Sequence, residues 1–87
     1  MKKIMVVEDF FIIKGRGLVA VGMPEEGASV VMNEGLTIIR PDGVAISTSV
    51  NGLEFISTVS SVKKLGILLF GITDKNEIPV GSTLFSV

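Results

Sequence analysis

The sequence predicts an all-β protein that folds as a small closed antiparallel β-barrel of six to seven strands with Greek-key-like connections. Three observations support this fold class. Short runs of β-branched and aromatic residues recur at near-regular spacing, glycine- and proline-containing turns separate them, and no part of the chain requires a helix. Closing the sheet into a barrel also removes the exposed strand edges that promote aggregation.

The first third of the chain is organised around a glycine-rich bend, Gly15-Arg16-Gly17. We expect a short strand over residues 4–7, and further strands over residues 10–13 and 18–22, on the two sides of the bend. Glycine on both sides of Arg16 permits positive φ angles and close backbone approach, which is typical of a barrel corner. The guanidinium is the only large group at this corner, so we expect it to be exposed.

The middle of the chain contains a strong hairpin signal. Two strands, residues 36–40 and 44–50, face each other across Pro41-Asp42-Gly43. The second strand alternates apolar with small polar residues, which predicts one face on the core and one in water. The dipeptide Asn51-Gly52 that follows, taken alone, predicts a two-residue hairpin turn.

The last third of the chain predicts two more strands. Residues 55–64 are rich in serine and threonine and are expected to form mainly a loop. Residues 65–72 form a continuous apolar run, which is typical of a central strand with both faces covered. Residues 73–77 are a polar turn, and residues 83–87 are the final strand.

Length and composition predict a single domain over residues 1–87 with a modest core, because a chain of this size buries only about 60 to 65 % of its unfolded surface. The formal net charge is −1, so no global positive field attracts nucleic acid, and any RNA contact has to be local. The absence of cysteine excludes disulfides, a thiolate nucleophile and a soft metal site.

The mean hydropathy of +0.64 is high for so small a domain. It favours a partner protein or a second copy that covers part of the apolar surface, and ordinary scattered exposure is the alternative. The longest apolar run is too short to span a bilayer, and the first residues lack the apolar region of a signal peptide. We therefore expect a cytoplasmic protein with no membrane partner.

The residues for catalysis are scarce. Histidine, cysteine, tyrosine and tryptophan are absent, and the adjacent carboxylates of residues 8–9 and 25–26 point to alternate faces of an extended chain. No Gly-x-x-x-x-Gly-Lys-Ser/Thr motif is present, so this chain is not expected to bind GTP by that route. The sequence thus predicts a protein that is not an enzyme and has no cofactor and no metal site.

Several short motifs follow one another along nearly the whole chain. They are Phe11-x-Ile13-x-Gly15-Arg16-Gly17, Val50-x-Gly52-Leu53-Glu54, Gly66-Ile67-Leu68-Leu69-x-Gly71-Ile72 and Ile78-x-x-Gly81-x-x-Leu84. In this order and spacing they resemble the second domain of elongation factor Tu and related translational GTPases, as a stand-alone domain. The resemblance implies that the strand before Asn51 continues through Leu53 and Glu54, with a β-bulge at Gly52.

In elongation factor Tu this barrel helps to hold the aminoacylated 3′ end of tRNA, and the terminal adenosine lies in a pocket around the Gly-Arg-Gly bend. The resemblance implies a matching set of RNA-binding residues, in which Glu54 lies against the adenine and Leu68 forms an apolar wall. The full set is Glu8, Asp9, Phe11, Gly15, Arg16, Val19, Glu54 and Leu68.

The chain departs from this family pattern at two places. Phe70 stands where many relatives have arginine, and residues 55–65 lack the Ala-Gly-Asp/Glu pattern common before the next strand. The expected function is a non-enzymatic binding module that contacts RNA, either a tRNA acceptor end or ribosomal RNA. The alternative is a protein interaction or assembly module, as a homo-oligomer or with a partner that includes a GTPase in trans.

Overall fold

In the computed structural model, which describes residues 1–57 and 63–87, seven β-strands form one antiparallel sheet. Within these two ranges no helix occurs that is long and apolar enough to cross a membrane. The strands are β1 (Lys2–Val6), β2 (Asp9–Ile13), β3 (Gly17–Gly22), β4 (Gly35–Ile39), β5 (Ala45–Ser57), β6 (Lys63–Leu69) and β7 (Thr83–Ser86).

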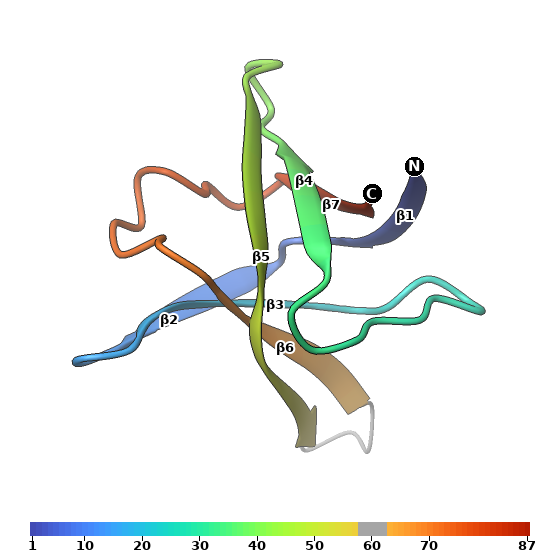
Figure 1. The fold of residues 1–87 in the computed structure, drawn as a ribbon, viewed down its shortest axis with the longest axis horizontal. Helices are drawn as coiled ribbons and strands as arrows, with labels where there is room; N and C mark the ends of the chain where they lie inside the picture. Colours follow the sequence, from blue (N-terminus) through green and yellow to red (C-terminus); the bar gives the residue numbers. More distant parts are fainter. Residues whose placement is uncertain (58–62) are drawn as a thin grey trace.

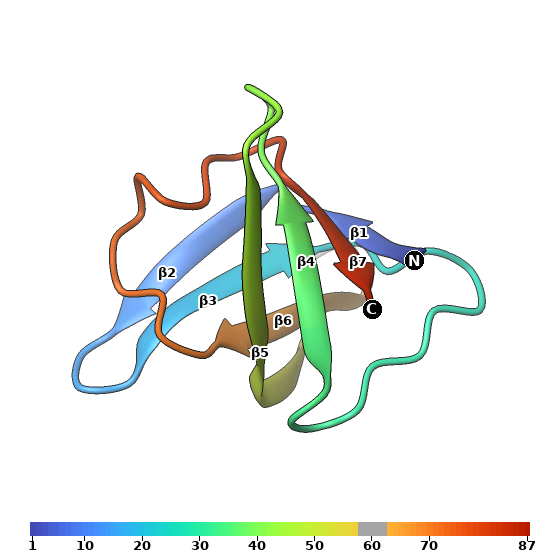
Figure 2. The ribbon, with the colours of Figure 1, turned by 45° about the horizontal axis from the view of Figure 1, so that its top comes forward.

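The sheet has the strand order β1-β7-β4-β5-β6-β3-β2 and coils into a half-barrel (Figure 1). All pairs in this order are antiparallel. Strands β1 and β7 pair with each other, so the two ends of the chain lie close together (Figure 2). The all-β prediction is therefore confirmed.

Strand β5 belongs to both halves of the sheet. Its first part pairs with β4, and its second part pairs with β6. The register shifts between Val50 and Gly52, which is the bulge expected at this position, and the two-residue turn that Asn51-Gly52 alone would predict does not form. The strand bends there, so β4 and the first part of β5 cross over β6, β3 and β2 (Figure 2).

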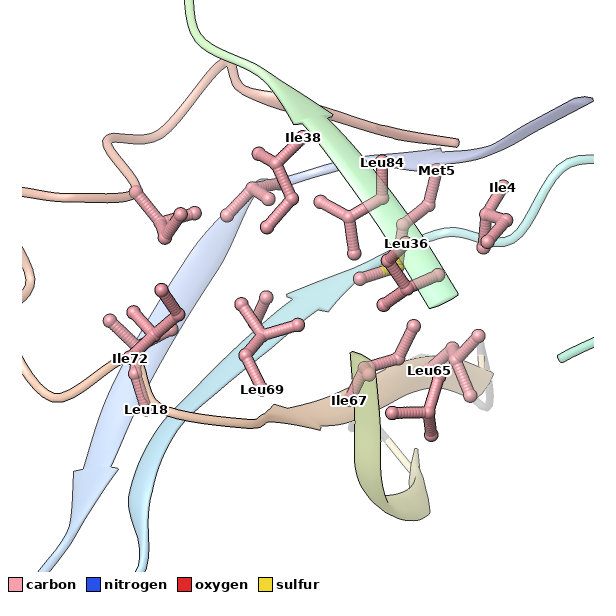
Figure 3. Packing of buried hydrophobic residues seen from close by; sticks show 14 residues of the cluster. Ile4, Met5, Leu18, Leu36, Ile38, Leu65, Ile67, Leu69, Ile72 and Leu84 are labelled. Carbon is pink, nitrogen blue, oxygen red and sulfur yellow. The ribbon is translucent and has the colours of Figure 1, made fainter. Parts of the chain in front are cut away.

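The main core lies between the two halves of the sheet. In Figure 3, the side chains of Leu36 and Ile38 from β4 face those of Leu65, Ile67 and Leu69 from β6. Every strand except β2 contributes a fully buried apolar residue, and β2 adds the partly buried Phe10. The cluster consists of Ile4, Met5, Val7, Leu18, Ala20, Leu36, Ile38, Val50, Leu65, Ile67, Leu69, Ile72, Ile78 and Leu84.

Strands β3 and β6 are covered on both faces. All six residues of β3 are buried, and so are residues 65–69 of β6, which confirms the prediction for the first five residues of the apolar run. The prediction is wrong at its end, because β6 stops at Leu69 and residues 70–71 are exposed. Their inner side chains belong to the main core. Their outer side chains, Val19, Val21 and Leu68, form a second cluster with the partly buried Ile13.

The hairpin predicted around residues 41–43 is confirmed by the pairing of β4 with β5. The turn is closed by a hydrogen bond from the Arg40 amide to the Val44 carbonyl, 2.9 Å long. Gly43 has a φ of +88°, which a residue with a side chain rarely adopts.

The loop expected over residues 55–64 is too long. Strand β5 continues to Ser57 and β6 begins at Lys63, with Phe55 opposite Leu65. Serine and lysine have no strong strand preference, and here the pairing of two consecutive strands decides the structure. Residues 58–62, which complete the expected loop, lie outside the described residues.

Candidate functional site

A pocket of about 210 Å³ lies on the face of β3, β5 and β6 that is opposite to the main core. Pockets for drug-sized ligands measure about 300–1,000 Å³, so this one suits a group the size of a single ring system. Its lining residues are Ile13, Arg16, Val19, Gly52, Leu53, Glu54, Gly66 and Leu68.

The strand register brings the pocket residues together. Val19 on β3 is opposite Leu68 on β6, and Leu68 is opposite Gly52 on β5. One step further along, Glu54 on β5 is opposite Gly66 on β6. Residues that are directly opposite in an antiparallel pair have their side chains on the same face. Three distant parts of the sequence therefore share one surface.

Gly52 keeps the pocket open. A methyl group built at this position would lie 3.1 Å from Cβ of Leu68 and 3.9 Å from Nη2 of Arg16. The first distance is tighter than ordinary van der Waals contact, so any side chain here would fill space between the apolar wall and the guanidinium. Gly52, the first residue paired after the register shift in β5, thus leaves room for a ligand.

The glycine-rich bend holds Arg16 at the rim of the pocket. The Arg16 amide donates a hydrogen bond to the Ile13 carbonyl, 2.9 Å long, and the flanking Gly15 and Gly17 have φ angles of +81° and +127°. A Cβ atom at Gly17 would lie 2.9 Å from the carbonyl oxygen of Ile72, so only glycine fits there. The predicted corner and the exposed position of Arg16 are confirmed.

The charged side chains at the pocket are available to a ligand. Within the described residues, the ion pairs are Lys3 with Glu25, Arg40 with Asp42 and Lys64 with Glu8, and none of them involves Arg16 or Glu54. Both of these side chains line the pocket and are exposed. A guanidinium and a carboxylate can each form charge-assisted hydrogen bonds with a bound polar group.

The structure brings together four of the eight residues predicted from the sequence. Arg16, Val19, Glu54 and Leu68 line the pocket, and Gly15 lies in the bend beside it without lining it. Phe11 also lies outside the lining, although it is opposite Val19 on the neighbouring strand β2 and is 41 % exposed.

Glu8 and Asp9 make other contacts. Oε1 of Glu8 accepts a hydrogen bond from Nζ of Lys64 at 2.8 Å, and its Oε2 accepts one from the Met23 amide at 3.3 Å. Oδ1 of Asp9 accepts a hydrogen bond from the amide of Phe10 at 2.8 Å. Neither residue lines the pocket, and Glu8 instead links the start of β2 to β6.

Four pocket residues were not predicted from the sequence. They are Ile13, Gly52, Leu53 and Gly66, all of which occur in the motifs quoted above but were not assigned to the site. The alternation of faces along a strand would have linked Ile13 to Phe11 and Gly66 to Leu68. The register that aligns β5 with β6 does not follow from alternation within either strand.

The pocket combines apolar and charged side chains. The pocket walls are apolar at Ile13, Val19 and Leu68, and the polar groups are one guanidinium and one carboxylate. In the part of the chain that the structure describes, no three carboxylates gather as a metal site would require. No protein-family model matches the sequence.

We predict that replacement of Gly17 by alanine destabilises the fold far more than the same change at Gly15. Both positions have positive φ, which costs about 1–2 kcal/mol for a residue with a side chain. Only at Gly17 does the added methyl also meet the Ile72 carbonyl, which raises the expected loss to about 3 kcal/mol or more. Urea unfolding of both variants measures this difference, and equal losses would contradict it.

We also predict that the Lys64–Glu8 ion pair makes stability depend on pH. The hydrogen bond from Lys64 holds the pKa of Glu8 below its ordinary value of 4.5. A carboxyl whose pKa is lowered by folding stabilises the folded state above the unfolded pKa, and this stabilisation is lost as the pH falls through the folded pKa. The effect is expected to be small because the pair is exposed.

Thermal unfolding of Glu8→Gln from neutral to acidic pH measures this contribution. The variant should melt below the wild-type protein at pH 7, and the two should converge in acid once Glu8 is protonated. Glu26→Gln is a matched control, because it removes the same charge from an exposed glutamate that forms no ion pair within the described residues. A constant difference at every pH would argue against the ion pair as the cause.

Proposed function

We propose that this chain is a non-enzymatic RNA-binding module, similar to the second domain of elongation factor Tu, whose pocket receives the 3′-terminal base of an RNA. A tRNA acceptor end or ribosomal RNA is the proposed partner. The observation that carries the proposal is that Arg16, Val19, Glu54 and Leu68, which the family resemblance assigns to one adenosine pocket, line one pocket here. They come from three strands and a bend.

The chemistry of the pocket suits a nucleobase. A flat base needs apolar walls, an acceptor for its amine and a cation near its phosphate. Val19 and Leu68 provide walls, Glu54 can accept from an exocyclic amine, and Arg16 can donate to a phosphate. A volume of about 210 Å³ suits one base and not several.

The proposal includes closure of the half-barrel. Residues Val7 and Glu8 join β1 to β2, the two outermost strands of the sheet. The Val7 amide donates to the Ser82 carbonyl and the Glu8 amide to the Val21 carbonyl, both at 2.8 Å. These consecutive residues extend the pairing of β1 with β7 and of β2 with β3, which brings the two edges of the sheet together and supports closure.

We expect the affinity of this one site to be weak, with a dissociation constant of about 10⁻⁴ M, in the range of non-specific contacts with nucleic acid. The net charge of −1 provides no attraction beyond the guanidinium at the rim. Weak binding by one module fits a function in which further contacts come from another domain or partner.

A second candidate function is protein binding, with a GTPase in trans or a second copy as the partner. It is favoured by large apolar side chains on the surface, among them Phe55 at 73 %, Phe70 at 63 % and Val31 at 60 % exposure. Sedimentation tests it, because a strictly monomeric chain that captures no protein would count against this alternative.

The RNA proposal predicts a local and saturable NMR response. Titration of the ¹⁵N-labelled protein with a short RNA that ends in CCA should shift the amide signals of Val19, Glu54 and Leu68. Arg16→Ala should weaken binding about tenfold, because it removes the cation near the phosphate. A flat titration at millimolar RNA, or one unchanged in the variant, would reject the proposed site.

The proposal also predicts that Gly52→Ala blocks the pocket while the protein stays folded. The added methyl would lie between Leu68 and Arg16, so RNA binding should fall about tenfold or more. Ser47→Thr, which adds a methyl at an exposed position on the other half of β5, is the control and should bind normally. Unchanged affinity in Gly52→Ala would mean that the base binds elsewhere.

A further inference from the structure

Phe70 is a large exposed aromatic side chain two residues after Leu68, which lines the pocket. Its side chain is 63 % exposed, although it directly follows five buried residues of β6. Exposure of so much aromatic surface is unfavourable for an isolated chain. The residue therefore has no evident function in the core.

The backbone of Phe70 is held firmly in place. Its amide donates to the Ser49 carbonyl at 3.0 Å, and its carbonyl accepts from Oγ1 of Thr48 at 2.6 Å. Both partners lie on β5, and the next residue, Gly71, turns the chain away with a φ of +75°. The side chain thus projects from a fixed point of the sheet and not from a mobile loop.

Phe70 directly follows Leu69, the last residue of β6, and lies in the turn after the strand, outside the residues that line the pocket. Along β6 the side chains alternate, so that Ile67 and Leu69 belong to the main core and Leu68 lies on the pocket face. The hydrogen bond from the Phe70 amide to Ser49 extends the pairing of β6 with β5 by one residue, and the alternation, continued by this residue, would place the Phe70 side chain on the side of Leu68. Residues two apart along a strand, such as Leu68 and Phe70, are separated by about 6.7 Å. The phosphate linkage between two adjacent nucleotides can span this distance.

The chemistry of Phe70 limits what it can bind there. A phenyl ring has no charge and no hydrogen-bonding group, so it cannot hold a phosphate or read the edge of a base. It can stack on the face of any base, and such stacking is tolerant of sequence. A ring fixed beside the pocket wall is therefore suited to the nucleotide adjacent to the one in the pocket.

We propose that Phe70 stacks on the base of the penultimate nucleotide, while the pocket holds the terminal one. This inference rests on the proposed RNA-binding function and adds a second subsite to it. The stacked nucleotide lies on the 5′ side, because a 3′-terminal base has no nucleotide after it. The site then selects an extended single-stranded end of at least two nucleotides over a free mononucleotide.

The first test compares adenosine monophosphate with the dinucleotide cytidylyl-adenosine. The adenine of either ligand can fill the pocket, and only the dinucleotide has a second base that reaches Phe70. Phe70→Ala should weaken dinucleotide binding about 5- to 100-fold, the effect expected for the loss of one base–aromatic stacking contact, and leave the mononucleotide unaffected. Phe55→Ala is the matched control, since Phe55 is exposed on the opposite face of β5 from Glu54.

A fluorescence measurement tests stacking directly. The protein contains neither tryptophan nor tyrosine, so Phe70→Trp introduces a single indole. The dinucleotide should quench this indole at saturation, and adenosine monophosphate should have little effect. The Phe55→Trp variant should respond to neither ligand, and equal quenching of both indoles would indicate non-specific contact and overturn the proposal.

The outcomes separate the two proposals. If neither ligand binds and Arg16→Ala changes nothing, the RNA-binding function itself fails. If both ligands bind through Arg16 but Phe70→Ala weakens them equally or not at all, the function stands and the stacking subsite is wrong. Selective loss of the dinucleotide, with selective quenching in Phe70→Trp, supports the second subsite.

Discussion

The structure depends on one bend, the bulge in β5 between Val50 and Gly52. A regular strand would pair with its neighbours in one plane, whereas this bulge allows one strand to pair with β4 before it and with β6 after it. The sheet can then fold over itself and enclose a core without a helix. The backbone groups of Val50 are satisfied by Asn33 and Glu34 from the preceding loop, which supports the bend from outside the strand ladder.

The same bend creates the candidate site on the outer surface. Because β3 and β6 are covered on both faces, a second apolar cluster lies outside the main core, and it forms the wall of the pocket. Gly52 leaves space beside Leu68, and the bend at residues 15–17 places Arg16 at the edge of that space. The chain has a net charge of −1, but the Arg16 guanidinium places a positive charge beside the apolar side chains of Val19 and Leu68. An apolar surface with a cation next to it matches what one base and its phosphate need for binding.

Local signals in the sequence were sufficient for most strands but not for the second part of β5. The hairpin at residues 41–43 and the corner at residues 15–17 follow from turn chemistry, which acts over a few residues. The pairing of Phe55 with Leu65 does not follow from turn chemistry. A segment with weak strand preference becomes a strand only when a partner strand satisfies its backbone groups. The same limit applies to Glu8, which was predicted for the site but forms an ion pair with Lys64 outside the pocket, because no residue near Glu8 in the sequence indicates this ion pair.

The sequence by itself determined the all-β class, the position of the turns and the exposure of Arg16, because periodicity of apolar residues and the conformational freedom of glycine are local properties. Only the tertiary structure decided which residues share a surface. The distance between Arg16, Glu54 and Leu68 is set by the register of three strands, and register is fixed by packing across the whole sheet. The pocket is therefore a property of the folded sheet, even though the residues that line it can be read along the chain.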